Sequence, residues 1–127
     1  MDSKKLALIC RSLAENKKAE KAVILDVRKL SSVTDYFVIV SGGSEPHLRA
    51  ITNEVTDQLR EKHQLRPRME GDASATWLVL DYFDVIVHIM HTGARQKYDL
   101  ESLWGDAPRV SAPKARRKAA KTTASAV

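Results

Sequence analysis

Residues 36–40, with the sequence YFVIV, constrain the fold more than any other stretch of this chain. Within "DYFVIVSG" (35–42) they are too continuously apolar for an exposed edge, so they predict an interior strand of a sheet. The shorter β-branched run "AVILDV" (22–27) predicts a second interior strand. The chain is therefore expected to build its core around a β-sheet.

Helical periodicity flanks these two strands. Leu6, Ile9, Cys10 and Leu13 fall on one helical face, which predicts a helix over about 3–18 with Ser3 as its cap. Ser44 is expected to cap a second helix that ends near residues 63–67. Its first turn holds Glu45 and Pro46, and its apolar stripe comprises Leu48, Ile51, Val55 and Leu59.

The second half of the chain reads as strands followed by a last helix. "RPRMEG" predicts a short strand, "ATWLVLDY" a longer one, and "DVIVHIM" its hairpin partner. "GARQKYDLESLW", beginning at Gly93, predicts a third helix, with Tyr98 and Trp104 as core anchors. The fold class is therefore α/β, a mixed sheet of about five strands with helices packed mainly on one face.

The predicted hairpin has two different faces, because alternate strand residues point to opposite sides. If it closes symmetrically around Tyr82 and Phe83, Trp77 lies opposite His88. The aliphatic face is expected beneath the helices and comprises Leu78, Leu80, Val85, Val87 and Ile89. The other face is expected to be uncovered, and it comprises Trp77, Val79, Ile86, His88 and Met90. Because tryptophan and methionine are enriched in interfaces, we interpret this second face as partner-binding and His88 as an interface residue, with core packing as the alternative.

Size, charge and cysteine content indicate one soluble domain. A length of 127 residues suits a single domain over 1–110, and no stretch is apolar enough to span a membrane. Without a signal segment, the cytoplasm is the expected location. Cys10 is the sole cysteine and is interpreted as a core residue. The net charge of +5 arises from the five basic residues of 111–127, a segment without acidic residues that is expected to be a disordered basic tail.

No catalytic or metal site is evident from the residues. The turn Gly42-Gly43-Ser44 follows a strand and opens a helix, which could hold a nucleotide phosphate. Nucleotidyl transfer also needs two acids on one strand face, whereas Asp81 and Asp84 are separated across a turn. The four histidines are too scattered to form a zinc site. We therefore predict no enzyme activity, no metal and no cofactor, and keep a nucleotide-binding enzyme at the glycine-rich turn as the alternative.

Two long blocks resemble the Iojap-like ribosomal silencing factors. They are "LSSVTDYFVIVSGGSEPHLRAITNEV" (30–55) and "WLVLDYFDVIVHIM" followed by "ARQKYDLESLWGDAP" (77–108). The resemblance implies a nucleotidyltransferase-like fold without its activity, and a repressor that lowers translation when nutrients are scarce. It also implies binding to the large ribosomal subunit through ribosomal protein L14, which blocks joining of the small subunit, and homodimers are known in the family. Phe83 departs from the family, which usually has glycine at that hairpin tip.

On this reading the docking surface is Trp77, Val79, His88 and Met90, with Tyr82, Phe83 and Arg95 at its margin. The basic tail lies outside the resemblance, and we expect it to add at most an auxiliary contact with ribosomal RNA.

Overall fold

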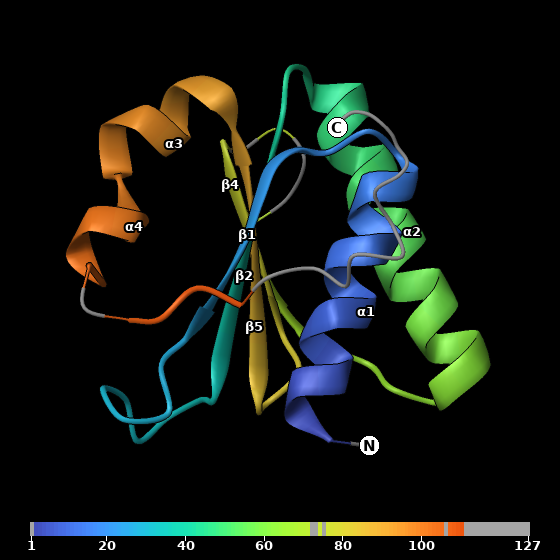
Figure 1. The fold of residues 1–127 in the computed structure, drawn as a ribbon. Helices are drawn as coiled ribbons and strands as arrows, with labels where there is room; N and C mark the ends of the chain where they lie inside the picture. Colours follow the sequence, from blue (N-terminus) through green and yellow to red (C-terminus); the bar gives the residue numbers. More distant parts are fainter. Residues whose placement is uncertain (1, 72–73, 75, 106, 111–127) are drawn as a thin grey trace, which may run out of the picture.

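A five-stranded mixed sheet in the order β1-β2-β5-β4-β3 forms the centre of the fold (Figure 1). The structure is a computed structural model that describes residues 2–71, 74, 76–105 and 107–110, so the basic tail lies outside the described residues. Neighbouring strands run antiparallel except β2 and β5, which are parallel. The strands are β1 (Glu20–Asp26), β2 (Tyr36–Gly42), β3 (Arg68–Glu70), β4 (Trp77–Asp81) and β5 (Val85–His91).

Two long helices, α1 (Ser3–Asn16) and α2 (Glu45–His63), lie on one side of the sheet. Two short ones, α3 (Thr92–Tyr98) and α4 (Leu100–Leu103), lie on the other (Figure 1). The predicted α/β class and mixed sheet are therefore confirmed. No helix in the described part of the chain is both long and apolar enough to cross a lipid bilayer.

Helix caps explain where the predicted boundaries held and where they were wrong. Ser44 caps α2 as expected, because its hydroxyl accepts the His47 N–H. Asp2, and not Ser3, caps α1, since the Asp2 carboxylate accepts the Lys4 N–H. The single third helix is in fact two, because Asp99 leaves helical geometry with φ +20° and its side chain caps α4.

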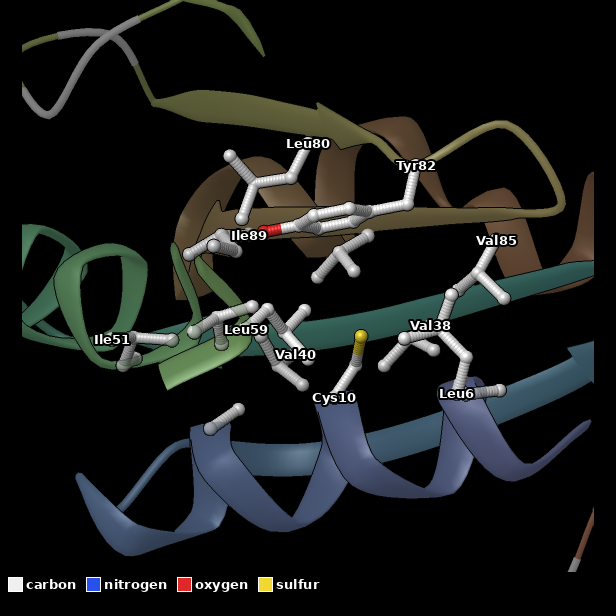
Figure 2. Close-up of a cluster of buried hydrophobic side chains, with 14 of the residues drawn as sticks. Leu6, Cys10, Val38, Val40, Ile51, Leu59, Leu80, Tyr82, Val85 and Ile89 are labelled. Carbon is white, nitrogen blue, oxygen red and sulfur yellow. The ribbon is translucent and has the colours of Figure 1, made fainter. Parts of the chain in front are cut away.

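The first core lies between the sheet and the two long helices, and it is the aliphatic face predicted from the hairpin. Leu80, Val87 and Ile89 are fully buried there (0% exposed) against α1 and α2. Figure 2 shows Leu6 and Cys10 of α1 pointing toward strand side chains such as Val38. Burial raises the pKa of the Cys10 thiol to about 12, so it stays protonated and serves as a small core residue, as predicted.

The second core lies on the opposite face, under α3 and α4. Its buried members are Leu25, Val27, Phe37, Ile39, Met90, Ala94, Leu100 and Ala107. The prediction that the hairpin face is uncovered is therefore wrong for His88 and Met90 of β5, which are buried. The reason is that α3 begins directly after β5 and folds back over the strands that precede it.

The strand β1 was predicted to be interior but is an edge strand of the sheet. Its outer side is covered by the last described residues, because the Asp26 N–H donates to the Pro108 carbonyl (2.8 Å). The Val110 N–H likewise donates to the Ile24 carbonyl (2.9 Å). Because this pairing satisfies the edge, a strongly apolar strand is tolerated there.

The β4–β5 hairpin closes two residues away from the predicted register. Trp77 pairs with Met90 and Val79 with His88, where Trp77 opposite His88 was expected. A shift of two residues leaves every side chain on its predicted face, because strand side chains alternate with a period of two. The assignment of faces was therefore right although the pairing was wrong.

Candidate partner-binding face

The second face of the sheet is covered unevenly. Its residues form rows across the strands, one running from Ile39 through His88 and Val79 to Glu70, and another from Phe37 through Ile86 and Asp81 to Arg68. On the β2 side, Phe37 and Ile39 are buried beneath α3 and α4. Toward β4 and β3 the cover ends, and Val79 and Ile86 are half-buried while the β3 side chains are exposed.

We call the half-buried apolar part of this face, Trp77, Val79 and Ile86, the open strip. Tyr98, at the end of α3, lies against Trp77 with ring centroids 5.2 Å apart. Tyr98 is 47% exposed, so the prediction that it is a core anchor is wrong and it belongs to the surface. Charged side chains, which include Arg68, Glu70 and Asp81, border the strip. An apolar centre with a polar rim is the anatomy of a protein interface.

His88 holds the tryptophan of the open strip in place. The Trp77 Nε1–H donates to His88 Nδ1 (3.0 Å), and the edge of Phe37 packs against the imidazole (centroids 5.1 Å apart). Because the indole N–H can only donate, Nδ1 is the acceptor and the proton of the neutral ring resides on Nε2. Burial lowers the pKa of His88 to about 4, so the ring is neutral at physiological pH.

His88 is therefore a packing and positioning residue more than a surface one. It is 9% exposed, and Nε2 has no hydrogen-bond partner among the described residues. Met90, which pairs with Trp77, is fully buried. These two predicted site residues are buried beside the open strip on the neighbouring strand, whereas only Trp77 and Val79 of the predicted central set reach the surface.

Arg95 was predicted at the margin of the docking surface, but the structure buries it (7% exposed). Its guanidinium pairs with Glu101 (Nε to Oε1, 3.0 Å) and donates to Ser41 Oγ (2.9 Å) and to the Glu20 carbonyl (3.3 Å). Glu101 in turn lies 3.5 Å from Arg109. The side chain thus ties β1, β2 and the α4 segment together.

Tyr82 and Phe83 also lie away from the open strip. Tyr82 is 8% exposed and belongs to the first core, on the opposite side of the sheet. Phe83 is 83% exposed at the hairpin tip, six residues and therefore about 20 Å of extended chain from Trp77. The structure thus does not bring the seven predicted residues into one patch. Ile86 and Tyr98 lie beside Trp77 and Val79, where Tyr82, Phe83 and Arg95 were predicted. The alternation of side chains along β5 already placed Ile86 on this face in the sequence.

The glycine-rich turn is occupied by internal hydrogen bonds. The Gly43 N–H donates to His47 Nδ1 (3.1 Å), and the His47 N–H donates to Ser44 Oγ. His47 Nε2 in turn reaches the Lys17 carbonyl (2.8 Å). These contacts engage the Gly43 and His47 N–H groups, which weakens the case for a phosphate site at this turn. Among the described residues, no group of three histidine, cysteine or acidic side chains is placed to hold a metal ion.

Fold and site together describe an α/β domain that carries a half-buried apolar strip with a charged rim. The family described as "Ribosomal silencing factor during starvation" matches residues 1–127. A relative from Bacillus subtilis, "Ribosomal silencing factor RsfS", is 40% identical over 108 residues, which cover 85% of this chain and 92% of the relative. The chain therefore belongs to the ribosomal silencing factor family.

Two further relatives place the family more widely. A crystal structure of a protein from Chromobacterium violaceum superposes with a TM-score of 0.78 at 30% identity, covering 83% of this chain and 88% of that one. A mouse protein named "Mitochondrial assembly of ribosomal large subunit protein 1" is 31% identical over 96 residues, 73% of this chain and 42% of its own length. The resemblance that the sequence blocks predicted is confirmed.

Proposed function

We propose that this protein binds the large ribosomal subunit through ribosomal protein L14 and sterically blocks joining of the small subunit. Membership of the silencing family supports a role on the ribosome. The name of the mouse relative, which refers to the large subunit, supports that subunit as the partner. On this proposal the protein works in the bacterial cytoplasm, lowers translation under nutrient limitation, and requires affinity and position but no catalysis.

The open strip is the proposed docking surface. The main observation in support is that Trp77 is held in a fixed orientation at the surface. A large ring presented at the surface in a fixed orientation loses little conformational freedom on binding, which is typical of interface hot spots. Trp77 is fixed by the hydrogen bond to His88 and by its contact with Tyr98. Val79 and Ile86 supply apolar area beside it, while His88 and Met90 are buried on the neighbouring strand.

The rival proposal, a nucleotide-binding enzyme at the Gly42-Gly43-Ser44 turn, has less support because the turn's hydrogen-bonding groups are paired internally. A thermal shift with nucleotides and Mg²⁺ separates the two proposals. Stabilisation of the protein by millimolar nucleotide would favour the enzyme.

The docking proposal is tested by comparing the two faces of β4. Trp77→Ala should weaken binding to purified ribosomal protein L14 by about 2 kcal/mol or more, the loss expected for a hot spot. Val79→Lys should also weaken it, since it places a charge in the strip without removing a core side chain. Leu80→Ala is the matched control on the helix-covered face. It should cost about 2 to 5 kcal/mol of folding stability and leave the affinity of the folded protein unchanged.

Isothermal titration and urea unfolding measure these two quantities separately. If Val79→Lys binds as tightly as the original chain, the strip is not the docking surface. If Leu80→Ala is folded but does not bind, the two faces have been assigned the wrong way round.

A further inference from the structure

The tip of the β4–β5 hairpin presents an aromatic ring in a constrained and exposed position. Phe83 is 83% exposed, and its backbone lies in the left-handed region at φ +80°. Both features are unfavourable for phenylalanine in a free protein, and such backbone outliers tend to occur at binding sites. Three hydrogen bonds hold the turn: the Tyr82 N–H donates to the Val85 carbonyl (2.9 Å), the Phe83 N–H to Asp81 Oδ1 (2.8 Å) and the Asp84 N–H to the Tyr82 carbonyl (3.0 Å). The backbone that presents the ring is therefore fixed by hydrogen bonds, while the ring itself faces solvent.

Two arginines lie beside this ring. Arg66 and Arg68 line the same hollow as Phe83, with a volume of about 400 Å³, together with Leu65, Asp81 and Tyr82. This volume falls within the roughly 300 to 1,000 Å³ of small-ligand sites. Within the described residues, every other arginine pairs with a carboxylate, whereas Arg66 and Arg68 make no ion pair. Their guanidinium groups are exposed and free to bind an anion.

An exposed aromatic ring beside two free guanidinium groups matches the chemistry of an unpaired nucleotide. The base stacks on the ring, and arginines bind the flanking phosphates. We propose that the hairpin tip binds single-stranded RNA, with a base on Phe83 and its neighbouring phosphates on Arg66 and Arg68. A duplex is a poor fit, because its bases are stacked on one another and present no free face to the ring.

The surrounding charges favour a local contact over general attraction to RNA. Asp81 lines the hollow and partly offsets the charge of the two arginines, and one Asp81 oxygen is already engaged by the Phe83 N–H. The contact is therefore limited to stacking and about two phosphates. It adjoins the Ile86 end of the open strip, because Arg68 and Asp81 lie in the same row of the sheet as Ile86. Binding to RNA and binding to ribosomal protein L14 are therefore measured separately for each variant.

Binding of a short fluorescent oligoadenylate to the full chain, followed by polarisation, tests this proposal. Phe83→Ala should lower affinity about 10-fold, in line with the loss of one stacked base, and Phe83→Trp should retain it. Arg66→Gln with Arg68→Gln should also lower affinity, and should reduce the slope of log affinity against log salt by about 1.4, the value for two phosphates of a single strand. The matched control, Lys17→Gln with Lys18→Gln, removes the same charge at the far end of α1 and should change affinity far less.

A second variant separates binding from folding. Phe83→Gly should raise the melting temperature, because glycine accepts φ +80°, while it weakens RNA binding as much as Phe83→Ala does.

Equal RNA affinity of Phe83→Ala and the original chain would overturn the proposal, and so would a preference for duplex RNA of the same length. If the Lys17/Lys18 control loses as much RNA affinity as the Arg66/Arg68 variant, the binding depends on the net charge of the protein and not on the hairpin tip. If Phe83→Ala weakens binding to ribosomal protein L14 but not to RNA, the tip contacts protein instead.

Discussion

At the scale of single residues, His88 links the interior of the protein to its surface. Its Nδ1 accepts the indole N–H of Trp77, so the buried imidazole holds the half-buried indole in place. Strand alternation was enough to place both on one face. The burial of His88 could not be predicted, because it depends on Phe37 and on α3, which approach from distant parts of the sequence.

The buried imidazole should make folding stability depend on pH. The pKa of His88 is about 4 in the folded protein and about 6.5 in an unfolded chain. The unfolded state therefore binds more protons between these values, so stability is complete above pH 6.5 and falls as the pH drops toward 4, by about 3 kcal/mol. Urea unfolding at a series of pH values measures this slope. His88→Gln should flatten it, and the account of His88 is wrong if the slope survives that substitution.

Arg95 should prove to be structural when its charge is removed. Arg95→Met leaves Glu101 and Ser41 without their partner. Breaking a buried ion pair in this way should lower the free energy of unfolding by about 3 kcal/mol. This is the lower end of the usual range, because Glu101 is partly solvated. Glu101→Gln, which keeps a hydrogen-bond acceptor for Arg95, should cost less. Thermal unfolding gives both values. A fully stable Arg95→Met with reduced partner affinity would instead return Arg95 to the docking surface.

At the scale of elements, the β4–β5 hairpin is where local sequence and structure disagree most. Residues 81–84 close the turn through side-chain and backbone bonds that force φ +80° on Phe83. The hairpin closes around Phe83 and Asp84, one residue along from the expected centre, which shifts each pairing by two residues. The tip residues gave no signal for this position, because a positive φ favours glycine and the chain has phenylalanine there. Helices with clear caps and stripes, such as α2, were predictable because their signals are local.

Removing the backbone strain at Phe83 should stabilise the fold. Phe83→Gly removes a strained conformation and an exposed ring at no cost to the core, so the free energy of unfolding should rise by about 1 kcal/mol. Val33→Gly, at a 74% exposed residue outside helix and strand with no positive φ, is the control and should give no gain. Chemical unfolding of both variants provides the measurement. A destabilised Phe83→Gly would mean that the ring contributes packing that outweighs the strain.

At the scale of the whole molecule, the sequence predicted an α/β sheet with two distinct faces and named the family correctly. It failed to predict which parts of the second face are covered. That coverage depends on how α3, α4 and residues 107–110 return to β1 and β2, through contacts such as the bond from the Asp26 N–H to the Pro108 carbonyl. These contacts join residues far apart in the chain, and no local pattern specifies them. The candidate site is therefore smaller than the predicted one, and it is limited to the open strip, where the cover by α3 and α4 ends.

We propose above that the protein occupies the large subunit and excludes the small one. Sedimentation of a cell lysate through a sucrose gradient, with the protein detected in each fraction, tests this most directly. We predict that it travels with free large subunits and is absent from joined ribosomes and from small subunits, and that Val79→Lys shifts it to the top of the gradient. Equal abundance on joined ribosomes would contradict the claim, because a protein that blocks subunit joining cannot remain on a joined ribosome.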